Sequence, residues 1–532
     1  MIFNNTFNLA KHILKREWKI ALIWLVILAG ISLAVAGVFQ DLYGTAVERI
    51  VMAETMSNPA MIAMIGPVYG LDNYTNGVMY AQMMLLFSIL AVAAMNIFLV
   101  VRHTRKDEES GRIELIRSLP VGRLSYLGGT VIVCLIVNVL LALITGFGLY
   151  SLNLESMDFA GSLAYGVALG VSGIFFGAIA ALFVQASSTS RGAISYSFIF
   201  LGAAYIIRAI GDVSAPALSY ISPLGIVLKT ETYASNYIWP IIVLITLSAI
   251  VFIFAFYLNS IRDLGAGLIA AKPGKSEASK FLQTPFGLSL RLLKGTIIGW
   301  AVTMFILGIS YGTVFGDIEN FLSGSELMQQ IFLGNDAFSF AEQFLSTLMV
   351  ISALLITIPT LIVLLKLRGE EKKGRLENIY AKKVSRNTML TNYLFLSFVT
   401  SILMTILFIF GLWGAAYASM EEPISFMIVF KAGMSYLPAI WLMIAGAVVL
   451  ISFIPKRTNF IWVLLGAFFY ISYIGKIMGI PDSVINATPF GAIPKIPVEN
   501  LSWIPLVILT AISIVMIVVG FFGYNERDMK QN

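Results

Sequence analysis

The sequence predicts an all-α polytopic membrane protein of about twelve transmembrane helices, built as two parallel six-span repeats. Three observations predict this class: 58% of the 532 residues are hydrophobic, only 12% are charged, and the mean hydropathy is +0.87. A typical soluble domain carries about 25% charged residues. A soluble fold of this length would need a polar shell that the composition does not supply, so the bilayer must be the solvent for most side chains.

Apolar runs of about 18 residues or more define the expected spans. The run at 424–454 is longer than one span needs, so we expect it to tilt or to begin with an interfacial segment. The first six spans are expected at 18–38, 80–101, 124–150, 161–184, 193–210 and 237–258. The second six are expected at 296–315, 344–365, 390–413, 424–454, 460–478 and 503–522.

The basic residues predict the orientation. With the amino terminus inside, about 29 of the 35 Lys and Arg lie in inner segments or at their borders, as the positive-inside rule requires. We therefore expect a multi-pass protein of the cell (plasma) membrane with both termini cytoplasmic. The same placement accounts for the formal charge of +6 without a nucleic-acid partner. Residues 1–17 are polar and basic and precede a run long enough to span, which predicts a retained anchor.

Residues that carry metal or redox chemistry are scarce. Cys134 is the single cysteine, and His12 and His103 lie outside the expected spans without forming a ligand cluster, so no metal-ligating or catalytic residue is predicted. The small residues at 166–177 favour close helix packing, with a substrate-binding role as the alternative. The sequence assigns no substrate-binding residue.

Two segments, each directly after the second span of its half, match at a constant offset of 263 (371 − 108). EESGRIELIRSLPVGR starts at Glu108, and EKKGRLENIYAKKVSR starts at Glu371. Apolar residues at i+3 spacing predict a short amphipathic helix in each segment; a solvated loop that only sets topology is the alternative. Orientation requires positive charge but no particular Glu, so two copies of the acid-Gly-Arg-x-Glu core favour a function. The matched residues are Glu108 and Glu371, Gly111 and Gly374, Arg112 and Arg375, Ile113 and Leu376, Glu114 and Glu377, Ile116 and Ile379, and Arg123 and Arg386.

This repeat predicts three parts: a first six-span half at 1–258, a cytosolic linker at 259–284 and a second half at 285–532. Ser-Pro-Leu-Gly at 222–225 and Thr-Pro-Phe-Gly at 488–491 are a second echo, on the outer side of each half. Each half also opens with a basic amphipathic stretch, and in the second half Thr284 is expected to cap a helix with Pro285 in its first position.

A paired inner helix between spans two and three of each half resembles the coupling helix of ABC-2-type exporter permeases. Over nearly its whole length the chain is similar to the tetronasin/polyketide-antibiotic exporter permeases, which fuse two such halves. The linker residues 262–268 and 272–274 and the stretch 208–212 share in this likeness. The resemblance implies the transmembrane permease subunit of an ATP-driven ABC exporter in a bacterial membrane. Such a subunit moves hydrophobic or amphipathic, antibiotic-like compounds out of the cell, which is efflux-based antibiotic resistance.

The resemblance also implies that the fourteen matched residues above form the ATPase-coupling contacts. The second segment departs from the first: Lys372 and Lys373 replace Glu109 and Ser110, and Lys383 stands in place of Pro120. These changes imply two coupling contacts of unequal strength.

No ATPase site is expected in the chain itself. The nearest imitation of a phosphate-binding loop is Pro-Gly-Lys-Ser at 273–276, but Ile269 occupies the position of the first required glycine. The chain is therefore expected to be no enzyme and to bind no cofactor directly, with ATP and Mg held by separate ATPase subunits. One chain already supplies two coupling helices, so two ATPase copies are expected as partners, besides the lipid bilayer and a hydrophobic small-molecule substrate.

The alternative function is an ion-coupled secondary multidrug carrier of the major-facilitator type, which also has two parallel six-span halves. Such carriers usually place titratable residues near the middle of the membrane. None of the 29 Asp and Glu lies in the middle of an expected span. Arg208 and Asp212 are four residues apart at an outer end, where snorkelling or local pairing is expected to account for them.

Overall fold

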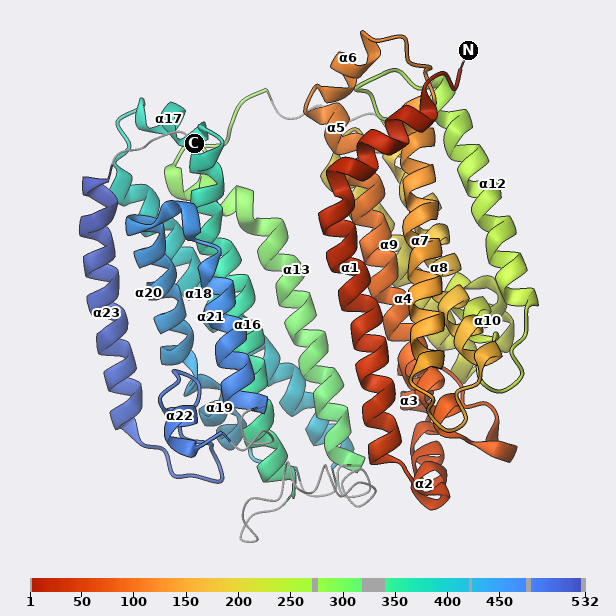
Figure 1. Ribbon diagram of the computed structural model, residues 1–532. Coiled ribbons are helices and arrows are strands. Elements are labelled where there is room, and N and C mark those ends of the chain that lie inside the picture. The colour runs from red at the N-terminus through yellow and green to blue at the C-terminus, as the bar shows by residue number, and fades with distance from the viewer. Residues whose placement is uncertain (1, 270–275, 318–339, 421–422, 475–479, 528–532) are drawn as a thin grey trace. The chain divides into compact units, whose positions relative to one another are not determined.

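Long apolar helices make up most of the computed structural model (Figure 1), which describes residues 2–269, 276–317, 340–420, 423–474 and 480–527. Within these ranges eleven helices are long and apolar enough to cross a membrane, and no strand is present. The all-α polytopic class is thereby confirmed. The chain divides into two compact units, Met1–Gly274 and Lys275–Asn532, and this boundary falls inside the stretch 259–284.

In the first unit, α8 (Phe159–Ala186) is the most buried of the long helices and packs against α4, α7, α9 and α12. Its glycines let α7 approach closely: a Cβ added to Gly166 would lie 2.3 Å from the Ala142 carbonyl oxygen. The small residues at 166–177 therefore serve helix packing. The other long helices of this unit are α1 (Thr6–Leu42), α4 (Asn76–Arg102), α7 (Ser125–Ser151), α9 (Ser190–Val213) and α12 (Trp239–Ile261). The basic stretch 7–16 is continuous with the first span, because α1 runs through both without a break.

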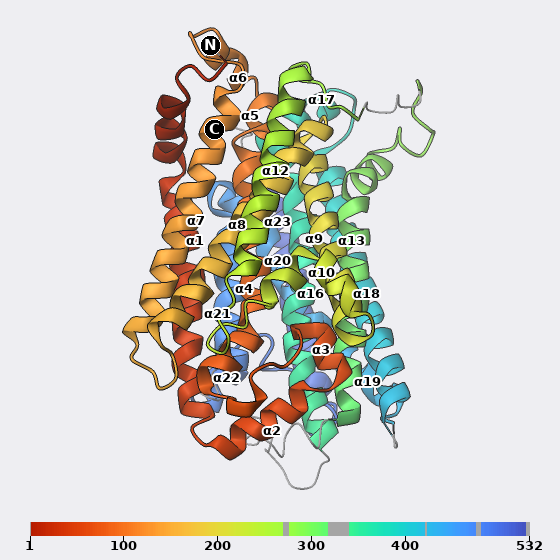
Figure 2. The same cartoon turned by 90° about the vertical axis from the view of Figure 1, so that its right-hand side faces the viewer.

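Short helices occupy the two ends of the first unit. Figure 2 shows α2 and α3 at the end opposite α6. One end carries α2 (Ala46–Met56), α3 (Pro59–Ile65), η1 (Leu71–Asn73), α10 (Pro216–Ile221) and α11 (Pro223–Leu228). The other carries α5 (Arg105–Glu109) and α6 (Arg112–Arg117).

In the second unit, α13 (Pro285–Val314) and α18 (Arg386–Ser419) are in close contact. A Cβ on Gly308 would lie 2.4 Å from the Phe408 carbonyl oxygen, so glycine permits this approach. The helix start is as predicted: the Thr284 hydroxyl accepts from the Gly287 amide (3.0 Å), and Pro285 is in the first turn. The remaining long helices are α16 (Phe340–Lys372), α20 (Leu437–Phe453) and α23 (Trp503–Glu526), and the short elements are η2 (Phe315–Asp317), α17 (Arg375–Tyr380), η3 (Pro455–Arg457) and α22 (Asp482–Asn486).

Two expected spans of the second half differ in the structure. The run 424–454 is broken into α19 (Phe426–Met434) and α20, because Pro438 lies in the first turn of α20 and cannot donate to a preceding turn. The expected span 460–478 appears as α21 (Phe460–Phe469) followed by the π-helical turn η4 (Tyr470–Ile474). This helix is shorter than a full span, and residues 475–479 lie outside the described residues. Among the described residues, eleven helices therefore reach membrane length, and the end of the twelfth expected span falls outside them.

The second sequence echo has the same local structure in both units. The Ser222 hydroxyl accepts from the Gly225 amide (3.5 Å), and the Thr488 hydroxyl accepts from the Gly491 amide (3.0 Å). A Cβ on either glycine would lie within 2.2 Å of a backbone carbonyl oxygen, so only glycine fits this tight turn.

Candidate functional site

The two matched segments begin in the same way. Gly111 precedes α6 with φ 73°, and Gly374 precedes α17 with φ 66°. Both values lie in the left-handed region, which glycine adopts without a steric penalty. The shared glycine therefore sets the turn that starts each short helix.

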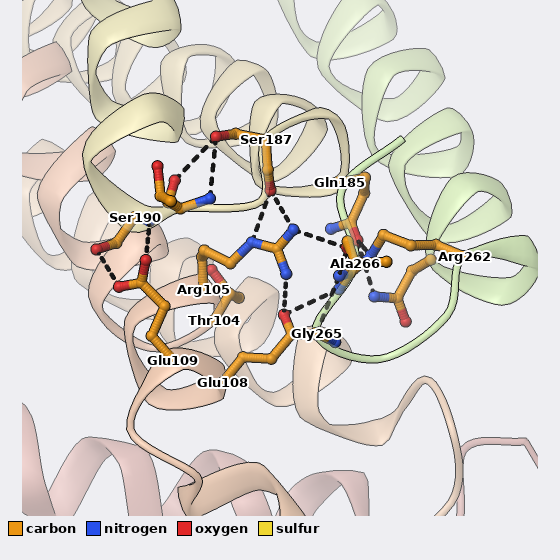
Figure 3. A network of polar contacts seen from close by, with 12 residues as sticks. Thr104, Arg105, Glu108, Glu109, Gln185, Ser187, Ser190, Arg262, Gly265 and Ala266 are labelled. Atoms are coloured by element: carbon orange, nitrogen blue, oxygen red, sulfur yellow. Dashed lines mark hydrogen bonds and ion pairs between the residues drawn. The ribbon is translucent and has the colours of Figure 1, made fainter. Parts of the chain in front are cut away.

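In the first unit, the Glu108 carboxylate is the centre of a buried ionic network (Figure 3). It accepts from Arg105 (2.9 Å), from Arg262 (3.0 Å) and from the backbone amide of Gly265 (2.7 Å). All three charged side chains are nearly inaccessible, at 1% for Arg105, 5% for Arg262 and 6% for Glu108. Arg105 also donates to the carbonyls of Ser187 and Ala266. The start of the linker is therefore bound to the matched segment.

The second unit contains the same network around Glu371. This carboxylate accepts from Arg368 (2.9 Å) and from Arg527, the residue that follows the last span. Arg368 donates to the Pro455 carbonyl (3.1 Å), as Arg105 does to a carbonyl in the first unit. In both units the last matched arginine closes the network: Arg123 donates to the Arg262 carbonyl and Arg386 to the Arg527 carbonyl, each at 2.8 Å.

Sequence reasoning missed Arg262 and Arg527 as partners of the matched glutamates. A signal was present, because Arg-Asp follows the last span of each half at 262–263 and at 527–528. The two arginines are 265 residues apart (527 − 262), whereas the segments match at 263, so a constant offset does not pair them. In each unit the structure joins the end of the sixth span to the segment that follows the second.

A second, partly exposed ion pair accompanies each buried network. Arg112 lies 3.0 Å from Asp107, and Arg375 lies 3.1 Å from Glu370. The arginine side chains remain 60% and 58% exposed, whereas the two carboxylates are buried. Asp107 is further bound by Arg16 and by the Tyr126 hydroxyl (2.6 Å), and Glu370 by Lys366 (2.8 Å). Each guanidinium is thus oriented by its own unit and still reaches solvent.

The matched apolar residues, which the resemblance implied as ATPase-coupling contacts, lie mainly in the interior of their own units. Ile113 and Leu376 are buried within their own units, at 8% and 2% exposure, because each anchors its short helix to the helices beneath it. Ile116 and Ile379 are half-buried, so they too belong mainly to the interior of their units. The residues that protrude are Leu115 and Leu119 in the first segment, at 74% and 59%. The same offset places Asn378 and Lys382 at these positions in the second segment, so only the first offers an apolar surface.

The matched residues therefore divide by position. Glu114 and Glu377 lie exposed on α6 and α17, beside the exposed arginines. Tyr380 ends α17 and shares a hydrogen bond with Tyr524 (3.3 Å), and burial raises the pKa of its hydroxyl. The residues that hold the segments in place are Glu108, Gly111, Ile113, Arg123, Glu371, Gly374, Leu376 and Arg386. Those exposed at the surface are Arg112, Glu114, Arg375 and Glu377.

The fold and the paired segments define a polytopic helical membrane protein with a matched pair of surface segments. Comparison with known proteins narrows this class. The family model "Multidrug efflux system permease Rv1217c, C-terminal domain" matches residues 19–258 and 282–525. The chain is 32% identical to the multidrug efflux system permease protein Rv1217c of Mycobacterium tuberculosis (strain ATCC 25618 / H37Rv), over 99% of this chain and 96% of that protein. It belongs to this family of multidrug efflux system permeases.

Proposed function

We propose that this chain is the permease subunit of an ATP-driven ABC exporter, within the tetronasin/polyketide-antibiotic group, that moves hydrophobic or amphipathic compounds outward. ATP is hydrolysed by separate subunits that hold ATP and Mg and dock on α6 and α17 from the cytoplasm, where both termini lie. The family membership supports efflux of several compounds as the activity.

One observation carries the ATPase-coupling part of the proposal. The same ionic network is built twice, and each copy presents an oriented arginine and an exposed glutamate on a short helix. A loop that only sets topology requires neither a buried glutamate nor a fixed arginine. Two like surfaces on one chain suit two copies of one partner, so we expect one permease chain with two ATPase chains. A mass measurement that gives two permease chains for two ATPases would contradict this stoichiometry.

The placement of carboxylates argues against the ion-coupled carrier. Glu17 is a buried acid inside α1, several turns from either end of that helix. Its carboxylate lies 3.2 Å from Arg102 and 3.1 Å from His103, at the end of α4. It therefore lies at the border of the apolar layer and not in its middle, where a carboxylate that relays protons across the membrane would be needed. We expect efflux to require ATP and to persist when a protonophore removes the proton gradient while ATP is maintained.

The coupling role is tested by the double variant Glu114→Ala/Glu377→Ala. Acidic residues barely influence topology, so insertion should be normal, whereas loss of desolvated charge pairs with a partner should weaken ATPase binding by about 2–5 kcal/mol per pair. Co-purification of the ATPase and substrate-stimulated hydrolysis measure the effect. Glu155→Ala removes an exposed acid from the opposite end of the first unit and is the matched control. Normal complex formation and hydrolysis in the double variant would contradict the proposal.

A further inference from the structure

The first segment carries Arg117 where the second carries Tyr380, and the two positions are related by the constant offset of 263 (380 − 117). In the second unit, the Tyr380 hydroxyl shares a hydrogen bond with that of Tyr524 (3.3 Å), which is 1% exposed. Tyr524 lies three residues before the arginine that follows the last span. In the first unit the residue three positions before the corresponding arginine is Asn259. An arginine and an asparagine therefore stand where the second unit has a pair of tyrosines.

A cavity of about 40 Å³ lies between the first segment and the end of α12. The polar and charged residues of its lining include Glu108, Arg117, Arg123, Asn259 and Arg262. Its volume has room for about three water molecules or for one compact anion. Arg117 reaches solvent and Asn259 is shorter than a tyrosine, so this place stays open in the first unit.

The charge of the cavity is positive. Glu108 is the one carboxylate in its lining, and it is already paired with Arg262 (3.0 Å) and Arg105 (2.9 Å) (Figure 3). Within the described part of the chain, Arg117 and Arg123 form no ion pair. Their guanidiniums donate to carbonyl oxygens, that of Arg117 to Arg123 (3.4 Å) and that of Arg123 to Arg262 (2.8 Å). Partial desolvation and the Arg123 charge lower the pKa of Arg117, so an anion beside the two side chains would stabilise them.

Guanidinium groups at a small cavity suit a phosphate group, because each planar fork can donate two hydrogen bonds to phosphate oxygens. The apolar surface beside the cavity indicates the source of that phosphate. Tyr257, Ile261 and Leu264, at the end of α12 and just after it, are 58%, 55% and 44% exposed, and Leu264 also lines the cavity. A basic pocket beside exposed apolar side chains at the end of a membrane-length helix suits a lipid headgroup with its acyl chains.

We propose that this cavity binds a phosphate group between Arg117 and Arg123, and we expect a membrane phospholipid to supply it. The bound phosphate then links α6 to the end of α12 in the first unit, as the pair of Tyr380 and Tyr524 links α17 to α23 in the second. This binding is independent of the proposed ATPase coupling.

Thermal unfolding of the purified full-length chain in detergent tests the site, with phosphatidylglycerol and diacylglycerol as probes. We expect phosphatidylglycerol to raise the Tm of the wild type, and diacylglycerol, which has no phosphate, to leave it unchanged. Arg117→Ala should lower the affinity for phosphatidylglycerol about tenfold or more. The matched control is Arg191→Ala, which removes an exposed arginine at the start of α9 that does not line the cavity. An equal loss in the control, or none in Arg117→Ala, would overturn the proposal.

A second variant covers the possibility that Arg117→Ala folds poorly. Arg117→Tyr/Asn259→Tyr gives the first unit the tyrosine pair of the second, so it should keep the Tm measured without a probe and lose the rise that phosphatidylglycerol gives to the wild type. Retention of that rise would contradict a phosphate site in this cavity.

Inorganic phosphate distinguishes the sources of the phosphate group. A rise in Tm with phosphatidylglycerol but not with millimolar inorganic phosphate supports a lipid, whereas an equal rise with both supports the site and assigns it to soluble phosphate. In either case Arg117→Ala must reduce the rise. If neither probe raises the Tm while Arg117→Ala weakens ATPase co-purification, the two arginines meet a carboxylate of a protein partner, and the proposal is wrong.

Discussion

The two units are alike at the ends that carry the matched segments and different in their interiors. Both ends contain a glutamate held by an arginine three residues earlier and by an arginine after the last span. In the interior of the first unit, Asn96 and Asn138 exchange two hydrogen bonds, of 3.0 and 2.6 Å, between α4 and α7. The same offset of 263 places Pro359 and Ser401 at these positions in the second unit.

Different side-chain contacts hold the helices together in the interiors of the two units. The two asparagines are fully buried and satisfy one another, so they fix α4 against α7. Pro359 lies inside α16 and cannot donate, while Ser401 accepts instead from the Trp441 indole of α20 at 3.1 Å. The difference teaches that the repeated geometry is confined to the helix ends, and the packing beneath them has diverged.

The largest expected effect tests the shared network. Glu108→Ala leaves Arg105 and Arg262 buried without a counter-charge, which should cost about 3–5 kcal/mol. Glu371→Ala should cost a similar but smaller amount, because Arg368 and Arg527 are slightly more exposed. Thermal unfolding in detergent measures both. The isosteric variant Glu108→Gln should lose less stability than Glu108→Ala. If either unit keeps its stability without its glutamate, the two networks are not equivalent.

The interior pairs should show the divergence directly. Asn138→Ala removes the two hydrogen bonds between the asparagines and leaves Asn96 with the Val92 carbonyl and the Cys134 thiol as partners, which should cost about 1–3 kcal/mol. Ser401→Ala orphans one indole donor and should cost about 1 kcal/mol. In the double variant Asn96→Ala/Asn138→Ala, neither amide is left unpaired, so the loss should be less than the sum of the single losses. Strict additivity would mean that the two asparagines do not act as a pair.

A smaller effect is expected at Glu109 of the first unit and at Lys372, which takes the equivalent position in the second unit. Glu109→Ala removes two hydrogen bonds from the first residue of α9, which should cost about 1 kcal/mol. Lys372→Ala in lipid-free detergent should change stability by less than about 0.5 kcal/mol, as is usual for an exposed side chain. Equal losses of Tm in the two variants would show that Glu109 and Lys372 stabilise their units to the same extent.

The smallest effect on stability is expected at the exposed arginines. Arg112→Ala and Arg375→Ala break pairs that are more than half exposed, and the buried acids keep Arg16 and Lys366 as partners, so each change should cost less than about 1 kcal/mol. ATPase co-purification should nevertheless fall with both. We expect the larger fall for Arg112, because Leu115 and Leu119 protrude beside it. Unchanged co-purification would restrict these arginines to a structural role.

Most of the fold could be predicted because apolar length alone identifies a membrane helix. The break at Ser435 and Tyr436 could not, since an apolar run does not reveal where its backbone bonds stop. The two matched segments could also be located from the sequence, because a glycine and its flanking charges recur at one offset. The sequence could not separate Ile113, which faces inward, from Leu115, which faces outward, without the surface beneath α6. It also could not reveal that Glu108 is neutralised by Arg262, which is 154 residues away.

The buried Arg208 has a consequence for interpreting genetic variants. Its guanidinium donates to the carbonyls of Ile62 (3.1 Å), Ala63 (2.6 Å) and Met64 (3.4 Å), which end α3, and to Asp212 (3.2 Å). One planar fork serves all of these acceptors, and the single ammonium of a lysine cannot reproduce it. If an Arg208→Lys allele is found in a drug-sensitive strain, the cause would therefore be a loosened contact between α3 and α9. A susceptibility screen alone would not distinguish this from the loss of a residue that contacts the drug.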